Sequence, residues 1–81
     1  MRTVNFHYQK FYMGQVVVAT KEYHNGLTHI HIGDLGYVQD ITIENLPDFG
    51  LFNIKIIHLK FGNHEFGLNQ TYAKEYVSGM L

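Results

Sequence analysis

Residues 37–61 read YVQDITIENLPDFGLFNIKIIHLKF, and this stretch decides the fold of the 81-residue chain. In its first part, Ile41 and Ile43 alternate with polar residues, which is typical of a strand with one buried face. The tetrapeptide PDFG at 47–50 places a proline at the second position of a type I turn and a glycine at its end. The stretch therefore predicts two antiparallel strands, 37–45 and 51–61, joined by a tight turn. The apolar phase of the second strand changes at Ile56 and Ile57, so we expect a β-bulge or a change of face there.

Upstream, apolar and polar residues alternate in segments 3–12, 15–24 and 27–32, which indicates three more strands. Met13-Gly14 predicts a turn between the first two segments. Asn25-Gly26 is a strong signal for a type I′ hairpin turn between the second and third.

Downstream, Gly62-Asn63 predicts a type II′ turn into a short strand at 64–68. The apolar positions 72, 73, 76, 77 and 80 then follow the spacing of one helix face. Asn69 or Thr71 is suited to the N-cap of this helix and Gly79 to its end. The helix is expected to cover one side of the sheet.

The composition fits one folded unit. Hydrophobic residues make up 46% of the chain and charged residues 16%, which excludes a disordered segment. We predict a single small β-rich domain over residues 1–81, mainly β within the α+β class. Its architecture is an antiparallel meander of five or six strands, curled into a small sandwich or partly open barrel, with one short C-terminal helix.

Two-residue loops at Met13-Gly14 and Asn25-Gly26 fix which residues share a sheet face. This register sorts most apolar residues onto one face and gathers a polar group on the other, namely Glu22, His24, His29 and His31. Imidazole and carboxylate ligands at such spacing suit Zn²⁺ or another divalent transition metal. A solvent-exposed histidine ladder that binds no ion has the same pattern, and both interpretations stay open.

The residues needed for nucleophilic catalysis or nucleic-acid binding are scarce in this chain. The chain has no cysteine, Ser78 is the single serine, and Arg2 is the single arginine. A serine or cysteine nucleophile and a basic surface for duplex nucleic acid are therefore not expected, and no phosphate-binding glycine motif is present. We expect no catalytic residues and no resident cofactor, with zinc as the alternative.

Twelve aromatic residues exceed what a small core can hide, so some are expected at an interface. The candidates lie at strand ends, at a turn and in the helix: Tyr12, Tyr37, Phe49, Phe52, Tyr72 and Tyr76.

These observations favour a non-enzymatic binding or assembly module that acts by protein–protein contact, with itself as a homodimer or with another protein. An accessory or inhibitor protein of a phage or other mobile element fits this size and this lack of catalytic groups. The alternatives are a histidine-rich module that binds a divalent metal and a binder of single-stranded nucleic acid or a nucleotide.

The longest apolar run, at residues 16–19, is far too short to cross a bilayer, and we expect a cytoplasmic protein without a signal peptide or membrane anchor.

Overall fold

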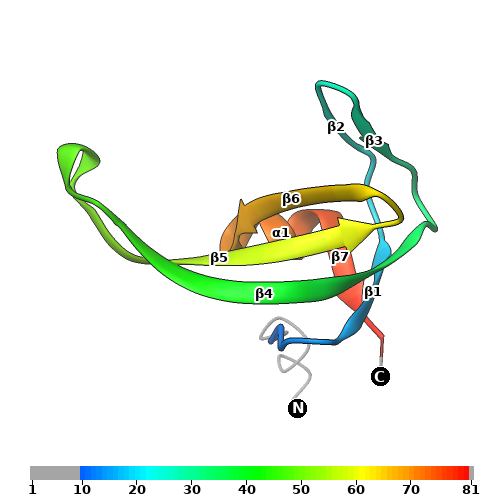
Figure 1. Cartoon of the computed structure of the whole chain (residues 1–81), viewed down its shortest axis with the longest axis horizontal. Coiled ribbons are helices and arrows are strands. Elements are labelled where there is room, and N and C mark those ends of the chain that lie inside the picture. Colours follow the sequence, from blue (N-terminus) through cyan, green and yellow to red (C-terminus); the bar gives the residue numbers. More distant parts are fainter. Residues whose placement is uncertain (1–9, 81) are drawn as a thin grey trace, which may run out of the picture.

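The computed structural model describes residues 10–80. The elements in chain order are β1 (Val16–Ala19), β2 (Tyr23–Asn25), β3 (Thr28–Ile30), β4 (Leu35–Leu46), the 3₁₀ turn η2 (Pro47–Phe49), β5 (Leu51–Phe61), β6 (His64–Asn69), α1 (Gln70–Tyr76) and β7 (Val77–Gly79). Five strands form an antiparallel sheet in the order β6-β5-β4-β1-β7, and β2 and β3 form a separate hairpin (Figure 1). The mainly β fold with a short C-terminal helix is confirmed, and the sheet does not close into a barrel.

The β4–β5 hairpin confirms the prediction made from residues 37–61. Pro47 occupies the first position of η2, where its missing amide hydrogen has no cost. Gly50 follows with φ 70°, and its amide donates a hydrogen bond to the carbonyl of Pro47 at 3.0 Å. Because this left-handed conformation favours glycine, the turn is fixed locally by its own sequence.

No bulge lies at Ile56 and Ile57, where the sequence allowed either a bulge or a change of face. These two residues pair with consecutive residues of β4 and of β6. Ile57 is fully buried, whereas Ile56 lies on the opposite face of the strand and is half-buried. The apolar side chains therefore change face along β5 while the strand itself stays regular.

The two irregularities of the hairpin lie elsewhere. Gln39 is an extra residue in β4, between the pairs that Val38 and Asp40 make with β5. A second shift lies near the turn, where Asn53 has φ 58° and its amide donates to the side-chain oxygen of Asn45 at 2.8 Å. Asparagine tolerates this left-handed conformation better than most residues do, so the bulge can form here.

The predicted pairing of segment 3–12 with segment 15–24 is wrong for the described residues. β1 has β4 on one side and β7 on the other, so neither of its edges is free. Residues 10–12 are not in a strand, and residues 3–9 lie outside the described part of the chain. Segment 15–24 also divides into β1 and β2, which belong to different sheets.

The predicted type I′ turn at Asn25-Gly26 is displaced by one residue. Tyr23 pairs with Ile30, so the loop consists of Gly26 and Leu27. Gly26 has φ 61°, and Leu27 has no positive φ, which defines a type II′ turn. This register places Tyr23 and Ile30 opposite each other, and both contact the core.

The C-terminal helix is shorter than predicted. Asn69 is its N-cap and accepts a hydrogen bond from the amide of Tyr72 at 2.9 Å, as expected. The helix ends at Tyr76, because Val77 joins β7 and pairs with Ala19. Gly79 is therefore in a strand and not at the end of the helix.

The core lies between one face of the sheet and α1. Its members are Phe11, Val17, Ala19, Ile30, Val38, Ile57, Leu59, Phe61, Ala73 and Val77. Among residues 10–80, no helix has the length and apolar character needed to cross a membrane.

Candidate functional site

β4 and β5 extend well beyond the strands beside them (Figure 1). β6 pairs with β5 only as far as Ile56, and β1 pairs with β4 only at residues 35–37. Residues 43–55, which we call the arm, therefore have no further strand beside them in the described part of the chain. An isolated two-stranded hairpin is only marginally stable in water, so the arm gains little stability from the rest of the described chain.

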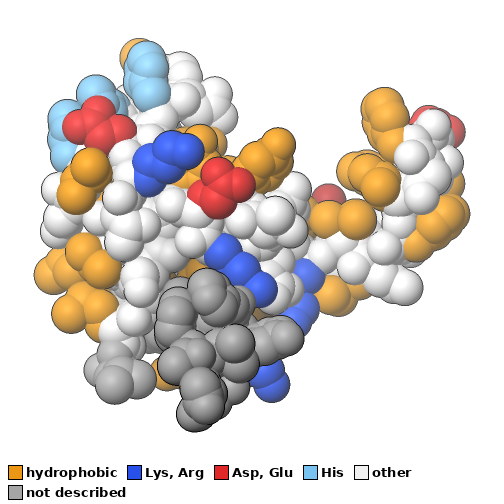
Figure 2. Space-filling view, turned by 180° about the vertical axis from the view of Figure 1, so that it is seen from behind, with side chains coloured by type: hydrophobic (Ala, Val, Ile, Leu, Met, Phe, Trp, Pro, Cys, Tyr) orange, Lys and Arg blue, Asp and Glu red, His pale blue; other side chains and the backbone are white. Residues whose placement is uncertain are grey.

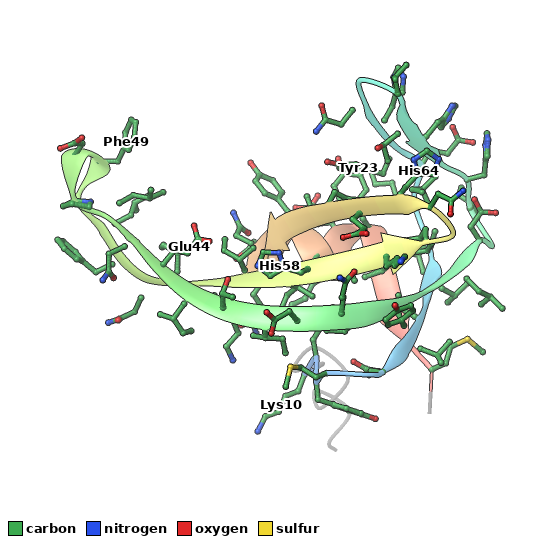
Figure 3. All side chains as sticks on the ribbon, in the orientation of Figure 1. Lys10, Tyr23, Glu44, Phe49, His58 and His64 are labelled. Carbon is green, nitrogen blue, oxygen red and sulfur yellow. The ribbon has the colours of Figure 1, made fainter. Side chains whose placement is uncertain are left out.

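The arm exposes large apolar side chains. Phe49 lies at its tip (Figure 3). Phe49 is 76% exposed, and Phe52 is 60% exposed. The exposed set is Ile43, Leu46, Phe49, Leu51 and Phe52. Their combined apolar surface is on the order of 500 Å², spread over both faces of the arm.

A groove of about 720 Å³ lies beside the arm. Four successive residues of β5, 53–56, line one side, so the groove follows the edge of that strand. Residues 67–72, at the junction of β6 and α1, line the other side. Figure 2 shows this hollow between the arm and the body of the molecule, with hydrophobic side chains on the arm.

The aromatic residues predicted for an interface do not form one surface. Phe49 and Phe52 lie on the arm, and Tyr72 lines the groove. Tyr12 and Tyr37 are exposed but lie outside both the arm and the groove lining. The sixth candidate, Tyr76, is half-buried and packs edge-on against Tyr23, with ring centroids 5.5 Å apart. It therefore belongs to the core.

The four polar residues predicted for a metal site share the outer face of the β2–β3 hairpin. Tyr23 and Ile30 face the core, and Tyr23 stacks on Phe66 with ring centroids 4.4 Å apart. Side chains alternate along a strand, so the residues on either side of these two face outward. The outward residues are Glu22, His24, His29 and His31. The one-position error in the turn did not change this grouping, because it moved each cross-strand partner by two residues.

Three of these residues bring ligand atoms together. Glu22 Oε1 lies 3.3 Å from His29 Nε2, and Glu22 Oε2 lies 3.7 Å from His31 Nδ1. One ligand atom from each of the three residues lies within 4.8 Å of the other two. The hydrogen bond from His29 is the main cause that lowers the pKa of Glu22 below its ordinary value of 4.5, and the charges of His31 and His29 act in the same direction. His24 is not one of these three residues. Its ring centroid lies 5.1 Å from that of His29.

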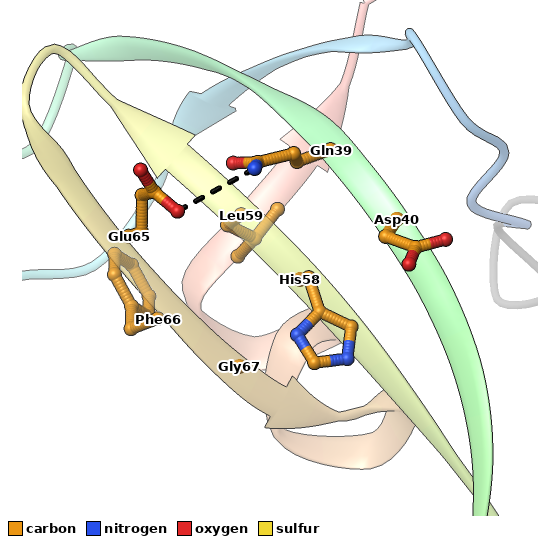
Figure 4. Close-up of a pocket in the computed structure, with 7 residues that line it drawn as sticks. All are labelled: Gln39, Asp40, His58, Leu59, Glu65, Phe66 and Gly67. Carbon is orange, nitrogen blue, oxygen red and sulfur yellow. Dashed lines mark hydrogen bonds between the residues drawn. The ribbon is translucent and has the colours of Figure 1, made fainter.

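His58 lies apart from this cluster, in a shallow pocket of about 260 Å³ (Figure 4). The pocket forms where Gly67 has no side chain to cover the imidazole. Gln39 donates a hydrogen bond to Glu65 across the pocket at 3.4 Å.

His58 Nε2 lies 2.8 Å from the hydroxyl of Thr42. A hydroxyl and an imidazole at this distance could act as nucleophile and base if a third group oriented the imidazole. Among the hydrogen bonds of residues 10–80, none joins a carboxylate to His58. The hydrogen bond between His58 and Thr42 is therefore interpreted as structural, because the third member of a catalytic triad is not found among the described residues.

Sequence reasoning missed the exposed aliphatic residues of the arm and the groove. Alternation showed which side chains share a face, but it does not show whether another element covers that face. The lengths of the strands carried the signal: the predicted strand 51–61 is about twice as long as the strand 64–68 that follows it. About half of strand 51–61 must therefore extend beyond strand 64–68.

Comparisons of the chain with protein-family models, with curated proteins and with solved structures find no match.

Proposed function

We propose that this protein is a non-enzymatic assembly module that binds a second copy of itself through the arm. The observation that carries the proposal is the arm, a two-stranded hairpin with five large exposed apolar residues and a groove at its base. The arm tip is a projection and the groove is a recess, and each copy of the chain supplies both. A two-fold axis beside the arm would place each tip in the groove of the other copy, so the two contacts would form together.

The available area fits a dimer. A stable interface buries about 800 Å² per partner. The apolar surface of the arm is on the order of 500 Å², and the groove residues that lie outside the arm, including Tyr72, add to it. An interface over the arm and groove would therefore reach the standard size without using the rest of the sheet.

The charges of the arm also favour a second copy. Glu44, Asp48 and Lys55 take part in none of the ion pairs found among residues 10–80. Each copy therefore offers both signs of charge to its partner. Two carboxylates against one ammonium group disfavour nucleic acid, which needs a basic surface.

The contact is expected to use side chains rather than a continuous sheet. The shift in register near Asn53 interrupts the edge of β5, and Lys55 places a charge on it. Both features are ways in which proteins prevent strand addition at an edge. The apolar side chains remain free to pack.

Cysteine cross-linking tests this arrangement, because the natural chain contains no cysteine. Asp48→Cys places a thiol at the arm tip beside Phe49, and Thr71→Cys places one in the groove beside Tyr72. When the two variants are mixed and mildly oxidised, we expect a cross-linked dimer that contains one of each. Leu27→Cys, at the fully exposed turn of the β2–β3 hairpin, is the control. Cross-linking of Leu27→Cys with Thr71→Cys at the same rate would refute the proposed contact.

A further inference from the structure

We propose that Glu22, His29 and His31 form a binding site for one divalent transition-metal ion, of the class that includes Zn²⁺ and Co²⁺. The site is independent of the proposed dimer contact, because the β2–β3 hairpin contributes no residue to the arm or to the groove lining. Two imidazole nitrogens and one carboxylate oxygen supply three protein ligands. Water takes the fourth position.

The ligand atoms are already close to the positions that a metal needs. In a tetrahedral site with bonds of about 2.0 to 2.1 Å, neighbouring ligand atoms lie roughly 3.3 Å apart. Glu22 Oε1 and His29 Nε2 are 3.3 Å apart, and Glu22 Oε2 and His31 Nδ1 are 3.7 Å apart. These two contacts use different oxygens of Glu22. One ligand atom from each residue lies within 4.8 Å of the other two. The longest separation would therefore shorten by up to about 1.5 Å on binding a metal, which exposed side chains can do by small rotations.

The backbone that carries the ligands is held on both sides. Below the site, Tyr23 stacks on Phe66 and Ile30 is buried in the core. At the base of the hairpin, the amide of His31 donates to the carboxylate of Asp34 at 2.9 Å. Ligands placed on anchored strands lose little freedom when a metal binds.

The choice of ligands predicts the choice of metal. Imidazole nitrogen with one carboxylate suits Zn²⁺, Co²⁺, Ni²⁺ and Cu²⁺, whereas Mg²⁺ and Ca²⁺ prefer sites built from oxygen. His24 is stacked beside His29 but stands outside the group of three whose ligand atoms converge. We assign it no bond to the metal.

Calorimetric titration of the full chain, purified without a polyhistidine tag and stripped with a chelator, tests the site. We expect one Zn²⁺ per chain and no heat of binding with Mg²⁺. His29→Ala, His31→Ala and Glu22→Gln should each weaken zinc binding by at least about 10-fold. Co²⁺ should give the visible absorption bands of a tetrahedral site in the natural chain and lose them in these variants.

Two matched variants serve as controls. His58→Gln keeps a polar group near Thr42 and removes a histidine far from the site, so it should leave the zinc affinity unchanged within about twofold. His24→Ala should change the affinity by less than about threefold. A loss of affinity in His58→Gln equal to that in His29→Ala, or the absence of saturable zinc binding, would overturn the proposal. A stoichiometry of one zinc per two chains would overturn the assignment of the site to a single chain.

Discussion

The two hairpins of this protein differ in what covers their apolar side chains. The β2–β3 hairpin is short, and its inward residues Tyr23 and Ile30 pack against the core, so the outward positions of its two strands are polar and Leu27 in its turn is the exposed apolar residue. The arm formed by β4 and β5 is longer, and no element of the described chain covers its apolar residues. The hairpin that is covered within one chain carries the histidines, and the hairpin that is not covered carries the exposed apolar surface that we propose binds a second copy. This difference is the basis of both proposals.

The same substitution at matched positions of the two hairpins tests the comparison most strongly. Ile30 is 3% exposed, and Ile43 is 58% exposed. Ile30→Ala should lower the free energy of unfolding by about 2 to 5 kcal/mol, because it opens a cavity in the core. Ile43→Ala should cost under about 0.5 kcal/mol in dilute, monomeric protein. Urea denaturation followed by circular dichroism measures both values, and equal losses would show that the arm is packed within one chain.

Removal of the two arm aromatics should affect association more than folding. The double variant Phe49→Ser with Phe52→Ser should weaken the dimer at least about 100-fold, or about 2.7 kcal/mol, because aromatic anchors dominate most interfaces. The matched control is Leu27→Ser with Ile32→Ser, which removes two exposed apolar residues near the other hairpin. Light scattering at a series of concentrations compares the two. If both double variants weakened the dimer equally, the arm would have no special role.

The turns of the two hairpins should respond differently to the same change. Gly26 has φ 61° and Gly50 has φ 70°, so valine is strained at either position. Gly26→Val should cost about 1 to 3 kcal/mol of global stability, because this hairpin unfolds with the core. Gly50→Val should lower the free energy of global unfolding by under about 0.5 kcal/mol, because the arm can open without unfolding the rest of the protein. Hydrogen exchange would locate that opening in residues 43–55, and a global loss from Gly50→Val would contradict it.

The smallest effect on stability is expected for His29→Ala, a substitution at the outer face of the β2–β3 hairpin, when no metal is bound. The contact between His29 and Glu22 is exposed, and exposed pairs contribute little to stability. With a chelator present, His29→Ala should change the free energy of unfolding by under about 0.5 kcal/mol. With zinc at about 100 times its Kd, the natural chain should gain roughly 2.7 kcal/mol that His29→Ala lacks. Thermal melting under both conditions measures the difference, and a large loss in chelator would give His29 a structural role instead.

The sequence predicted local features of the fold well. The turn from Pro47 to Gly50, the N-cap at Asn69 and the strand at 51–61 all depend on residues close together in the chain. The outward grouping of Glu22 with the three histidines was also predictable, because alternation fixes faces even when the turn is misplaced by one residue.

Contacts between distant segments could not be read in the same way. The pairing of Ala19 with Val77 joins residues far apart in sequence, and no local pattern specifies it. The same limit applies to the register at Asn25 and Gly26. There Tyr23 pairs with Ile30, and both contact core residues from distant segments, which the dipeptide alone does not specify.

Sedimentation equilibrium of the natural chain tests the central claim most directly. If the arm binds a second copy, the mass should rise from 9.4 kDa at low micromolar concentration toward twice that value at high micromolar concentration. The variant Phe49→Ser with Phe52→Ser should remain at the mass of one chain over the same range. A natural chain that stays at the mass of one chain throughout would contradict the account.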